Sequence, residues 1–169
     1  FRGRKRFALM KIALVGIGKI AVDQHVHAIF GSDQWSLGAT VSRQGAIENI
    51  KSYKDFDLLL AERSDIRVIS FCLPPVPRFD YAVKALKSGR HVMLEKPPGA
   101  TLSECHALIA LAQKLRLSLY ATWHSREADK VTVAKKWLVD KRLESLKVTW
   151  KEDVRRWHPN QNWIWEPGG

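Results

Sequence analysis

An apolar strand that breaks into a glycine turn and continues as a helix most constrains what this chain can fold into. Residues 12–16 are the apolar run, Gly16 and Gly18 form the turn, and apolar side chains at helical spacing predict a helix over residues 21–30. The first glycine permits a tight turn, and the second lets the backbone approach a diphosphate closely. The helix start supplies unpaired amides. Because the G-x-G-x-x-A pattern ending at Ala21 follows a strand and opens a helix, it predicts a dinucleotide site.

Strand and helix signals alternate along the chain beyond this motif. This alternation predicts an α/β fold of the Rossmann type, a doubly wound and mostly parallel sheet with helices on both faces. Pro77 is placed to open one helix and Gly89 to stop it, and Thr101 and Glu104 have the spacing of a capping box. The further strands are predicted at residues 35–42, 68–73, 91–95 and 118–123, and the further helices at residues 55–61, 78–88, 102–115 and 126–139.

The pattern changes near residue 143, which suggests a second domain. Residues 145–154 alternate apolar and polar side chains, which predicts a longer strand. We therefore expect an NAD(P)-binding domain over residues 10–125. Residues 126–169 are expected to be a linking helix and the beginning of an α+β open-sheet substrate domain in a truncated chain. Residues 1–9 precede Met10 and are strongly basic, and we interpret them as a leader that is not native to the fold.

The charge balance of the chain bears on its partners. The formal net charge is +11, from 28 Lys and Arg against 17 Asp and Glu. Four of the cations lie in the leader, the others are scattered along helices, and no zinc-finger or RNA-binding signature accompanies them, so we expect no nucleic-acid partner. No apolar run approaches the roughly 20 residues of a membrane span. Cys72 and Cys105 lack metal-ligand spacing, so we expect buried free thiols, no metal, and a cytoplasmic location.

The end of the second predicted strand bears on cofactor choice. An acidic residue there would bind the ribose 2′-hydroxyl of NAD, whereas this chain has Ser42 and Arg43. A hydroxyl and a guanidinium suit the 2′-phosphate of NADP, because arginine binds phosphate bidentately. The pattern indicates NADP as the preferred cofactor with NAD as the alternative, and a surface arginine without a ligand is an equally good reading of Arg43.

Three motifs together resemble a known family. They are the glycine turn, the Leu73-Pro74-Pro75 segment with Arg78, and the Glu95-Lys96-Pro97 segment at a strand end. This combination resembles the Gfo/Idh/MocA oxidoreductases. Within that family, residues 121–126, 150–159 and 163–169 are similar to bacterial aldose 1-dehydrogenases of the D-galactose/L-arabinose type. The resemblance implies oxidation of an aldose sugar at C1 to the aldonolactone by a longer, homo-oligomeric protein, and little catalysis by this chain alone.

The resemblance also implies roles for individual residues. Lys96 would be the catalytic residue, hydrogen-bonding the C1 hydroxyl and relaying its proton. The substrate would be bound by Lys96, His124, Glu152 and His158, whose polar groups can select sugar hydroxyls. Glu95 would orient the nicotinamide ribose. The full cofactor-binding set is Gly16, Ile17, Gly18, Lys19, Ile20, Ser42, Arg43, Leu73, Pro74, Pro75, Arg78, Glu95 and Lys96.

Other functions remain open at this point. A member of the same family could oxidise a ring hydroxyl, as inositol-type dehydrogenases do, or reduce an imine or a biliverdin-type substrate. The chain could also be a non-catalytic NAD(P)-binding regulatory domain. Lys96 argues against the regulatory reading, because a sensor has no use for a lysine beside the nicotinamide. For His124, Glu152 and His158, ordinary core or surface roles are as good a reading as substrate binding.

Overall fold

The computed structural model describes residues 9–167, which form two compact units. The first unit ends at Thr122, and the second covers Trp123–Pro167. Apart from Leu9, the basic leader expected over residues 1–9 lies outside the described residues.

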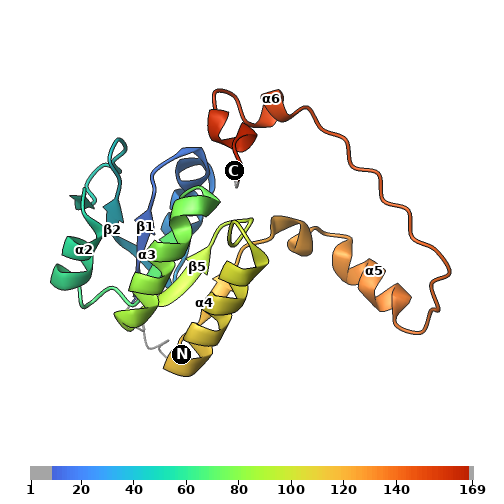
Figure 1. Cartoon of the computed structure of the whole chain (residues 1–169), viewed down its shortest axis with the longest axis horizontal. Helices are drawn as coiled ribbons and strands as arrows, with labels where there is room; N and C mark the ends of the chain where they lie inside the picture. The colour runs from blue at the N-terminus through green and yellow to red at the C-terminus, as the bar shows by residue number, and fades with distance from the viewer. Residues whose placement is uncertain (1–8, 168–169) are drawn as a thin grey trace, which may run out of the picture. The chain divides into compact units, whose positions relative to one another are not determined.

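The described part of the first unit is built on a parallel sheet of six strands, in the order β3-β2-β1-β4-β5-β6 (Figure 1). From β1 the chain moves outward to one edge, then returns to β4 and moves to the other edge. The strand order therefore reverses between β1 and β4, where ligands of open α/β sheets bind. This order confirms the predicted doubly wound fold. The strands are β1 (Met10–Val15), β2 (Trp35–Val41), β3 (Ser52–Tyr53), β4 (Val68–Phe71), β5 (His91–Leu94) and β6 (Leu119–Ala121).

Alternate residues of the central strands point into two separate cores. In β1, Ala13 and Val15 pack in one core with apolar side chains of α2 (Phe56–Glu62), α3 (Pro75–Lys87) and α4 (Leu102–Leu115). Ile12 and Leu14 pack in the other core, which is covered by the first helix. Helices therefore cover both faces of the sheet, which explains why its central strands read as continuous apolar runs.

The first helix differs from its predicted form. It consists of a π-helical segment η1 (Ala21–Val26) followed by α1 (His27–Phe30). The sequence pattern placed Val22 and Phe30 on the buried face, but both are exposed, and His25 is buried there instead. Because a π-helical turn holds more residues than an α-helical turn, the face that meets the sheet is shifted, and a polar side chain enters it.

The prolines after β4 begin a helix earlier than predicted. The α3 helix starts at Pro75, with Pro74 as the preceding cap, so Pro77 lies inside the first turn and does not open it. Proline is tolerated there because the first amides of a helix have no partner within the helix. The predicted stop is confirmed: α3 ends at Lys87, and Gly89 follows with φ at +78°.

The second unit contains short helices joined by irregular chain. They are η2 (His124–Glu127), α5 (Val131–Leu138), α6 (Val154–Trp157) and η3 (Asn162–Trp165). The helix predicted over residues 126–139 is therefore shorter. The strand predicted over residues 145–154 is wrong: no strand of the described residues pairs with this segment. Its apolar side chains, such as Leu146 and Trp150, are exposed. Alternation alone does not make a strand, because the backbone needs a hydrogen-bonded neighbour.

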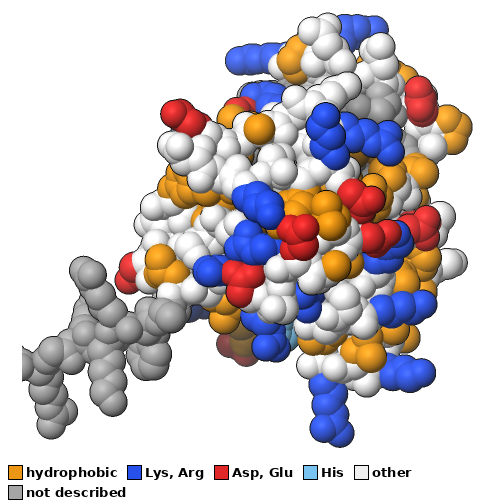
Figure 2. Space-filling view, turned by 90° about the vertical axis from the view of Figure 1, so that its left-hand side faces the viewer, with side chains coloured by type: hydrophobic (Ala, Val, Ile, Leu, Met, Phe, Trp, Pro, Cys, Tyr) orange, Lys and Arg blue, Asp and Glu red, His pale blue; other side chains and the backbone are white. Residues whose placement is uncertain are grey.

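Basic and acidic side chains are interspersed on the surface. On the face shown in Figure 2, Lys and Arg lie among Asp and Glu. Three lysines of the first unit pair with carboxylates at N···O distances of 2.7–2.9 Å, namely Lys11–Asp65, Lys51–Glu62 and Lys84–Asp57. Within residues 9–167, none of the helices has the length and apolar character to cross a membrane.

The predicted capping box provides a test of local stability. The Thr101 hydroxyl accepts a hydrogen bond from the Glu104 amide at 3.2 Å, and the Glu104 carboxylate accepts one from the Ala100 amide at 2.8 Å. We expect Thr101→Ala to lower the free energy of unfolding by about 1 kcal/mol, because an amide of α4 loses its acceptor. Urea denaturation measures this change. Thr101→Ser keeps the hydroxyl and is the control; equal stability of the Ala and Ser variants would contradict the cap.

Candidate cofactor site at the carboxyl edge of the sheet

The strand register places the residue after each strand in one row. Val15 pairs with both Val41 and Phe71, Phe71 pairs with Leu94, and Leu94 pairs with Ala121. The next residues along the chain therefore lie side by side at the carboxyl edge. In spatial order they are Ser42, Gly16, Cys72, Glu95 and Thr122. Motifs far apart in the sequence are brought together at this edge.

Gly16 lets the turn after β1 pack directly on the segment after β4. Its amide donates to the Val41 carbonyl at 2.8 Å, and its φ is +90°. A Cβ at this position would lie 2.9 Å from Leu73 Cδ2 and 3.1 Å from the Cys72 carbonyl carbon. Both the backbone conformation and the lack of space therefore require glycine.

Gly18 faces open space, in contrast to Gly16. A Cβ added there would meet no atom within 4 Å. The helix begins at this point: the Val22 amide donates to the Gly18 carbonyl at 3.1 Å. The first amides of a helix have no partner within it and attract anions. The open approach and the helix start therefore fit a dinucleotide diphosphate. Beside it, Lys19 forms an ion pair with Asp23.

The turn after β2 packs against the glycine turn. The Ser42 hydroxyl accepts hydrogen bonds from the amides of Gln44 (3.3 Å) and Gly45 (3.0 Å). A Cβ at Gly45 would lie 2.7 Å from the Ile17 carbonyl oxygen, so the two turns are in contact. Arg43 is exposed on this turn, and among residues 9–167 its guanidinium has no partner.

Arg78 is buried and connects two loops by hydrogen bonds. Its side chain comes from the first turn of α3, and the residue is only 2% exposed. The guanidinium donates to the Leu73 carbonyl after β4 and to the carbonyls of Glu95 and Pro97 after β5. These contacts give Arg78 a positioning role, and its direct contact with the cofactor stays a prediction. Pro75 is buried beside it, whereas Leu73 and Pro74 are half-buried at the edge.

Glu95 and Lys96 point in different directions. The Glu95 carboxylate turns inward: Oε1 lies 2.8 Å from His25 Nε2, and Oε2 accepts a hydrogen bond from the Lys96 amide at 3.3 Å. Its expected contact with the nicotinamide ribose stays a prediction. Lys96 is exposed, and its amine has no partner in the described residues. The structure thus places a residue with a free amine directly after Glu95, at the same edge of the sheet as Gly16.

His25 is a site residue that the sequence reasoning missed. It is 8% exposed, and Nδ1 lies 3.4 Å from the hydroxyl of the buried Ser70. Burial alone would lower the pKa of His25, but its hydrogen bonds with Cys72 and Glu95 outweigh burial and raise the pKa to about 9. Burial raises the pKa of Glu95, yet its hydrogen bond with His25 leaves that pKa below the ordinary value. The i, i+4 spacing of Ala21, His25 and Ile29 was the available signal.

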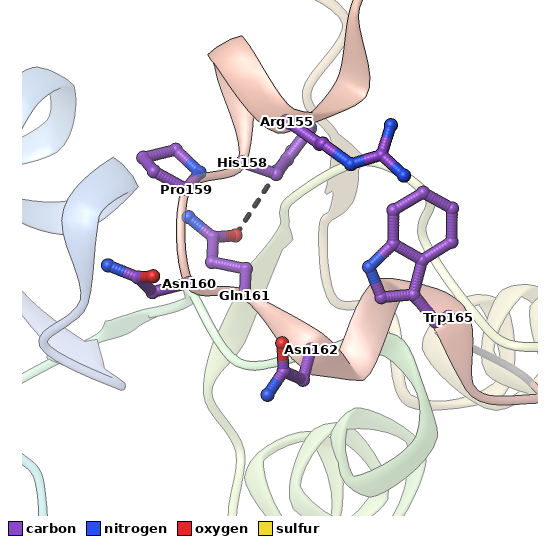
Figure 3. A pocket seen from close by; sticks show the side chains of 7 residues that line it. All are labelled: Arg155, His158, Pro159, Asn160, Gln161, Asn162 and Trp165. Carbon is purple, nitrogen blue, oxygen red and sulfur yellow. Dashed lines mark hydrogen bonds between the residues drawn. The ribbon is translucent and has the colours of Figure 1, made fainter.

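The residues expected to bind substrate are divided between the two units. Lys96 belongs to the first unit, whereas His124, Glu152 and His158 belong to the second, so their convergence stays a prediction. His124 and Glu152 are exposed. His158 is half-buried, with Nδ1 3.2 Å from the Gln161 side-chain oxygen. It lines an open hollow of about 350 Å³ (Figure 3) together with Arg155, Pro159, Asn160, Gln161, Asn162 and Trp165.

Both cysteines are free thiols, as expected, but they are half-buried and not fully buried. In the part of the chain that the structure describes, His, Cys, Asp and Glu side chains form no cluster of three that could hold a metal ion. A parallel sheet with a glycine turn at its switch point, an open helix start and a free lysine at the same edge defines the class: a dinucleotide-binding domain of an oxidoreductase.

The chain belongs to the Gfo/Idh/MocA oxidoreductase family. The family model described as an oxidoreductase family with an NAD-binding Rossmann fold matches residues 10–122. Galactose 1-dehydrogenase from Pseudomonas fluorescens is 37% identical over 159 residues, 94% of this chain and 51% of that protein. The crystal structure of a D-galactose-1-dehydrogenase from Rhizobium etli has 48% identity and a TM-score of 0.90, over 96% of this chain and 53% of that one.

A more distant relative acts at a different carbon. D-glucoside 3-dehydrogenase from Escherichia coli is 26% identical over 87% of this chain and 44% of that protein. The chain thus spans about half the length of the galactose dehydrogenases that it matches.

The His25–Glu95 pair predicts how stability depends on pH. His25 has a folded pKa of about 9 against 6.5 unfolded, so its contribution is complete below pH 6.5 and is lost as the pH rises through 9. The lowered pKa of Glu95 acts oppositely, and its contribution is lost in acid. Between pH 6.5 and 9.5 we expect the wild type to lose on the order of 2 kcal/mol of unfolding free energy relative to His25→Gln.

Urea denaturation at several pH values tests this expectation. His27→Gln is the matched control, because His27 lies on the same helix but is exposed. It should keep the wild-type pH dependence. Parallel profiles for the wild type and His25→Gln would show that folding does not raise the pKa of His25.

Proposed function

We propose that the complete protein is an NAD(P)-dependent aldose 1-dehydrogenase that oxidises a sugar of the D-galactose or L-arabinose type at C1 to the aldonolactone. The observation that carries this proposal is the extent of the likeness to galactose dehydrogenases. It covers 96% of this chain, whereas the Rossmann family model ends at residue 122. The likeness therefore includes the second unit, where His124, Glu152 and His158 lie.

Lys96 is the proposed catalytic base. Oxidation of C1 removes a hydride from the carbon and a proton from its hydroxyl, and the C1–O single bond becomes a carbonyl double bond. The nicotinamide ring supplies a hydride acceptor at C4 when the cofactor is bound. The Lys96 amine is exposed and unpaired among the described residues, so it is free to hydrogen-bond the C1 hydroxyl. In its neutral form it would accept the hydroxyl proton and become an ammonium group.

Different residues of the carboxyl edge are proposed to contact different parts of the cofactor. The helix start with its open glycine would hold the diphosphate through backbone amides, a contact assigned to Ile17, Gly18, Lys19 and Ile20. Gly16, whose amide donates to the Val41 carbonyl, would contribute by allowing the turn. Leu73, Pro74 and Pro75 would line the nicotinamide side. Arg78 holds the loops that carry these groups.

The turn after β2 supports a preference for NADP over NAD. Arg43 is exposed and without a partner among residues 9–167, on a turn that contacts the glycine turn. A guanidinium there can pair with a ribose 2′-phosphate, and the Ser42 hydroxyl can donate to it. The homo-oligomeric state and the cytoplasmic location stay predictions.

The Lys96 assignment is tested by Lys96→Met in the complete protein. We expect kcat for D-galactose or L-arabinose to fall by about 100-fold or more, because the hydroxyl proton loses its acceptor. The dissociation constant of the reduced cofactor, from fluorescence titration, should change little. Lys114→Met, an exposed lysine on α4, is the control. Retained turnover in Lys96→Met would refute the role of Lys96. A product oxidised at a ring hydroxyl would show that the protein does not act at C1.

The cofactor assignment is tested by Arg43→Asp. We expect the ratio of kcat/KM with NADP to that with NAD to fall on the order of 10- to 100-fold, because a carboxylate repels the 2′-phosphate that the guanidinium would bind. Arg67→Asp, an exposed arginine before β4 at the opposite edge of the sheet, is the control. An unchanged ratio in Arg43→Asp would remove Arg43 from the site.

A further inference from the structure

A buried hydrogen-bond chain connects the first helix with the loop that carries Lys96. His25 lies on the helix that begins at the glycine turn, and its two ring nitrogens face Ser70 Oγ at 3.4 Å and Glu95 Oε1 at 2.8 Å. The second carboxylate oxygen of Glu95 accepts the backbone amide of Lys96 at 3.3 Å. These hydrogen bonds thus link the first helix, through the side chains of His25 and Glu95, to the backbone of the loop that carries Lys96.

The side chains of this hydrogen-bond chain are buried, so each needs a partner in a fixed position. The side chains of His25 and Glu95 are 8% and 12% exposed. A carboxylate removed from water needs a partner, because leaving it unpaired is costly. Both nitrogens of His25 lie opposite oxygens, so a protonated imidazole can donate to both Ser70 and Glu95. The groups facing His25 from the neighbouring strands are Ser70, Cys72 and Glu95, and Arg78 is the nearby second cation.

We infer that His25 is a positioning residue: it holds the Glu95 carboxylate inward, and the carboxylate in turn fixes the peptide of Lys96 at the carboxyl edge of the sheet. This inference rests on the proposed role of Lys96 as the base. His25 itself touches neither the lysine amine nor the open space above Gly18.

The backbone of the same loop is held independently by Arg78. Its guanidinium donates to the carbonyls of Glu95 and Pro97, on either side of Lys96. Arg78 therefore fixes the carbonyls and His25, through Glu95, fixes the amide. The amine of Lys96 is left without a partner in the described residues and is free to act. Loss of His25 would release one of the two restraints while the other keeps the loop in place.

This division predicts a specific kinetic effect. The helix start that would hold the diphosphate lies more than one turn before His25 and would not use its side chain. Removing the imidazole should therefore leave cofactor affinity nearly unchanged while the amine of Lys96 is less well placed for proton transfer. Small misplacements of a catalytic group reduce kcat strongly.

The test compares His25→Phe, His25→Gln and His27→Gln in the complete protein. For His25→Phe we expect kcat to fall on the order of 10- to 100-fold, with less than about a threefold change in the dissociation constant of the cofactor. Hydrogen exchange of the Lys96 amide, followed by NMR, should become faster. His25→Gln can still donate to Glu95 and should recover part of both effects, and His27→Gln should match the wild type.

Two outcomes would overturn the inference. One is a His25→Phe variant that folds and keeps wild-type kcat and wild-type exchange of the Lys96 amide. The other is an equal loss of cofactor affinity and kcat in His25→Phe and His25→Gln, which indicates a structural role only. If the wild type itself oxidises no aldose, the proposed function fails, yet the exchange measurement still reports whether His25 fixes the Lys96 peptide.

Discussion

The buried guanidinium of Arg78 is the contact on which the carboxyl edge of the sheet depends. It donates to carbonyls of the loops that follow β4 and β5, and so joins the two segments on the nicotinamide side of the proposed site. These carbonyls lie at the ends of strands, where no further ladder bonds are available. A cation that is 2% exposed and surrounded by backbone oxygens satisfies them together, and the loops are held without the use of any group needed for chemistry.

Two neighbouring polar side chains at this edge, those of Glu95 and Lys96, face in opposite directions. Glu95 points into the protein toward His25, whereas its neighbour Lys96 points to solvent. Both residues follow β5, which ends at Leu94, and the Glu95 carboxylate is held inward by its contacts with His25 and the Lys96 amide. The inward carboxylate is neutralised by an imidazole from a different element, so the amine beside it does not become its partner. Glu95 and Lys96 are adjacent in sequence but therefore have separate roles.

Much of the fold was predictable because burial on both faces leaves a strong signal. The apolar runs at β1 and β4 and the glycine turn between strand and helix fixed the class of fold from residues alone. The capping box at Thr101 was found because its chemistry is local. The buried place of His25 was not found, because a π-helical turn shifts the helix face and its partner lies 70 residues away in sequence. The strand predicted over residues 145–154 failed since pairing depends on a neighbour that alternation cannot specify.

The sheet order has a consequence for how the protein folds. Important contacts at the carboxyl edge join segments distant in sequence: Gly16 meets Cys72, and His25 meets Glu95. Such contacts require long loops to close, which makes the parallel strand pairing slow to nucleate. The proposed nucleotide site is built from such contacts, so it depends on the native pairing of these strands. A dinucleotide held there would bind the native state alone, and by mass action it would raise the melting temperature of the whole domain.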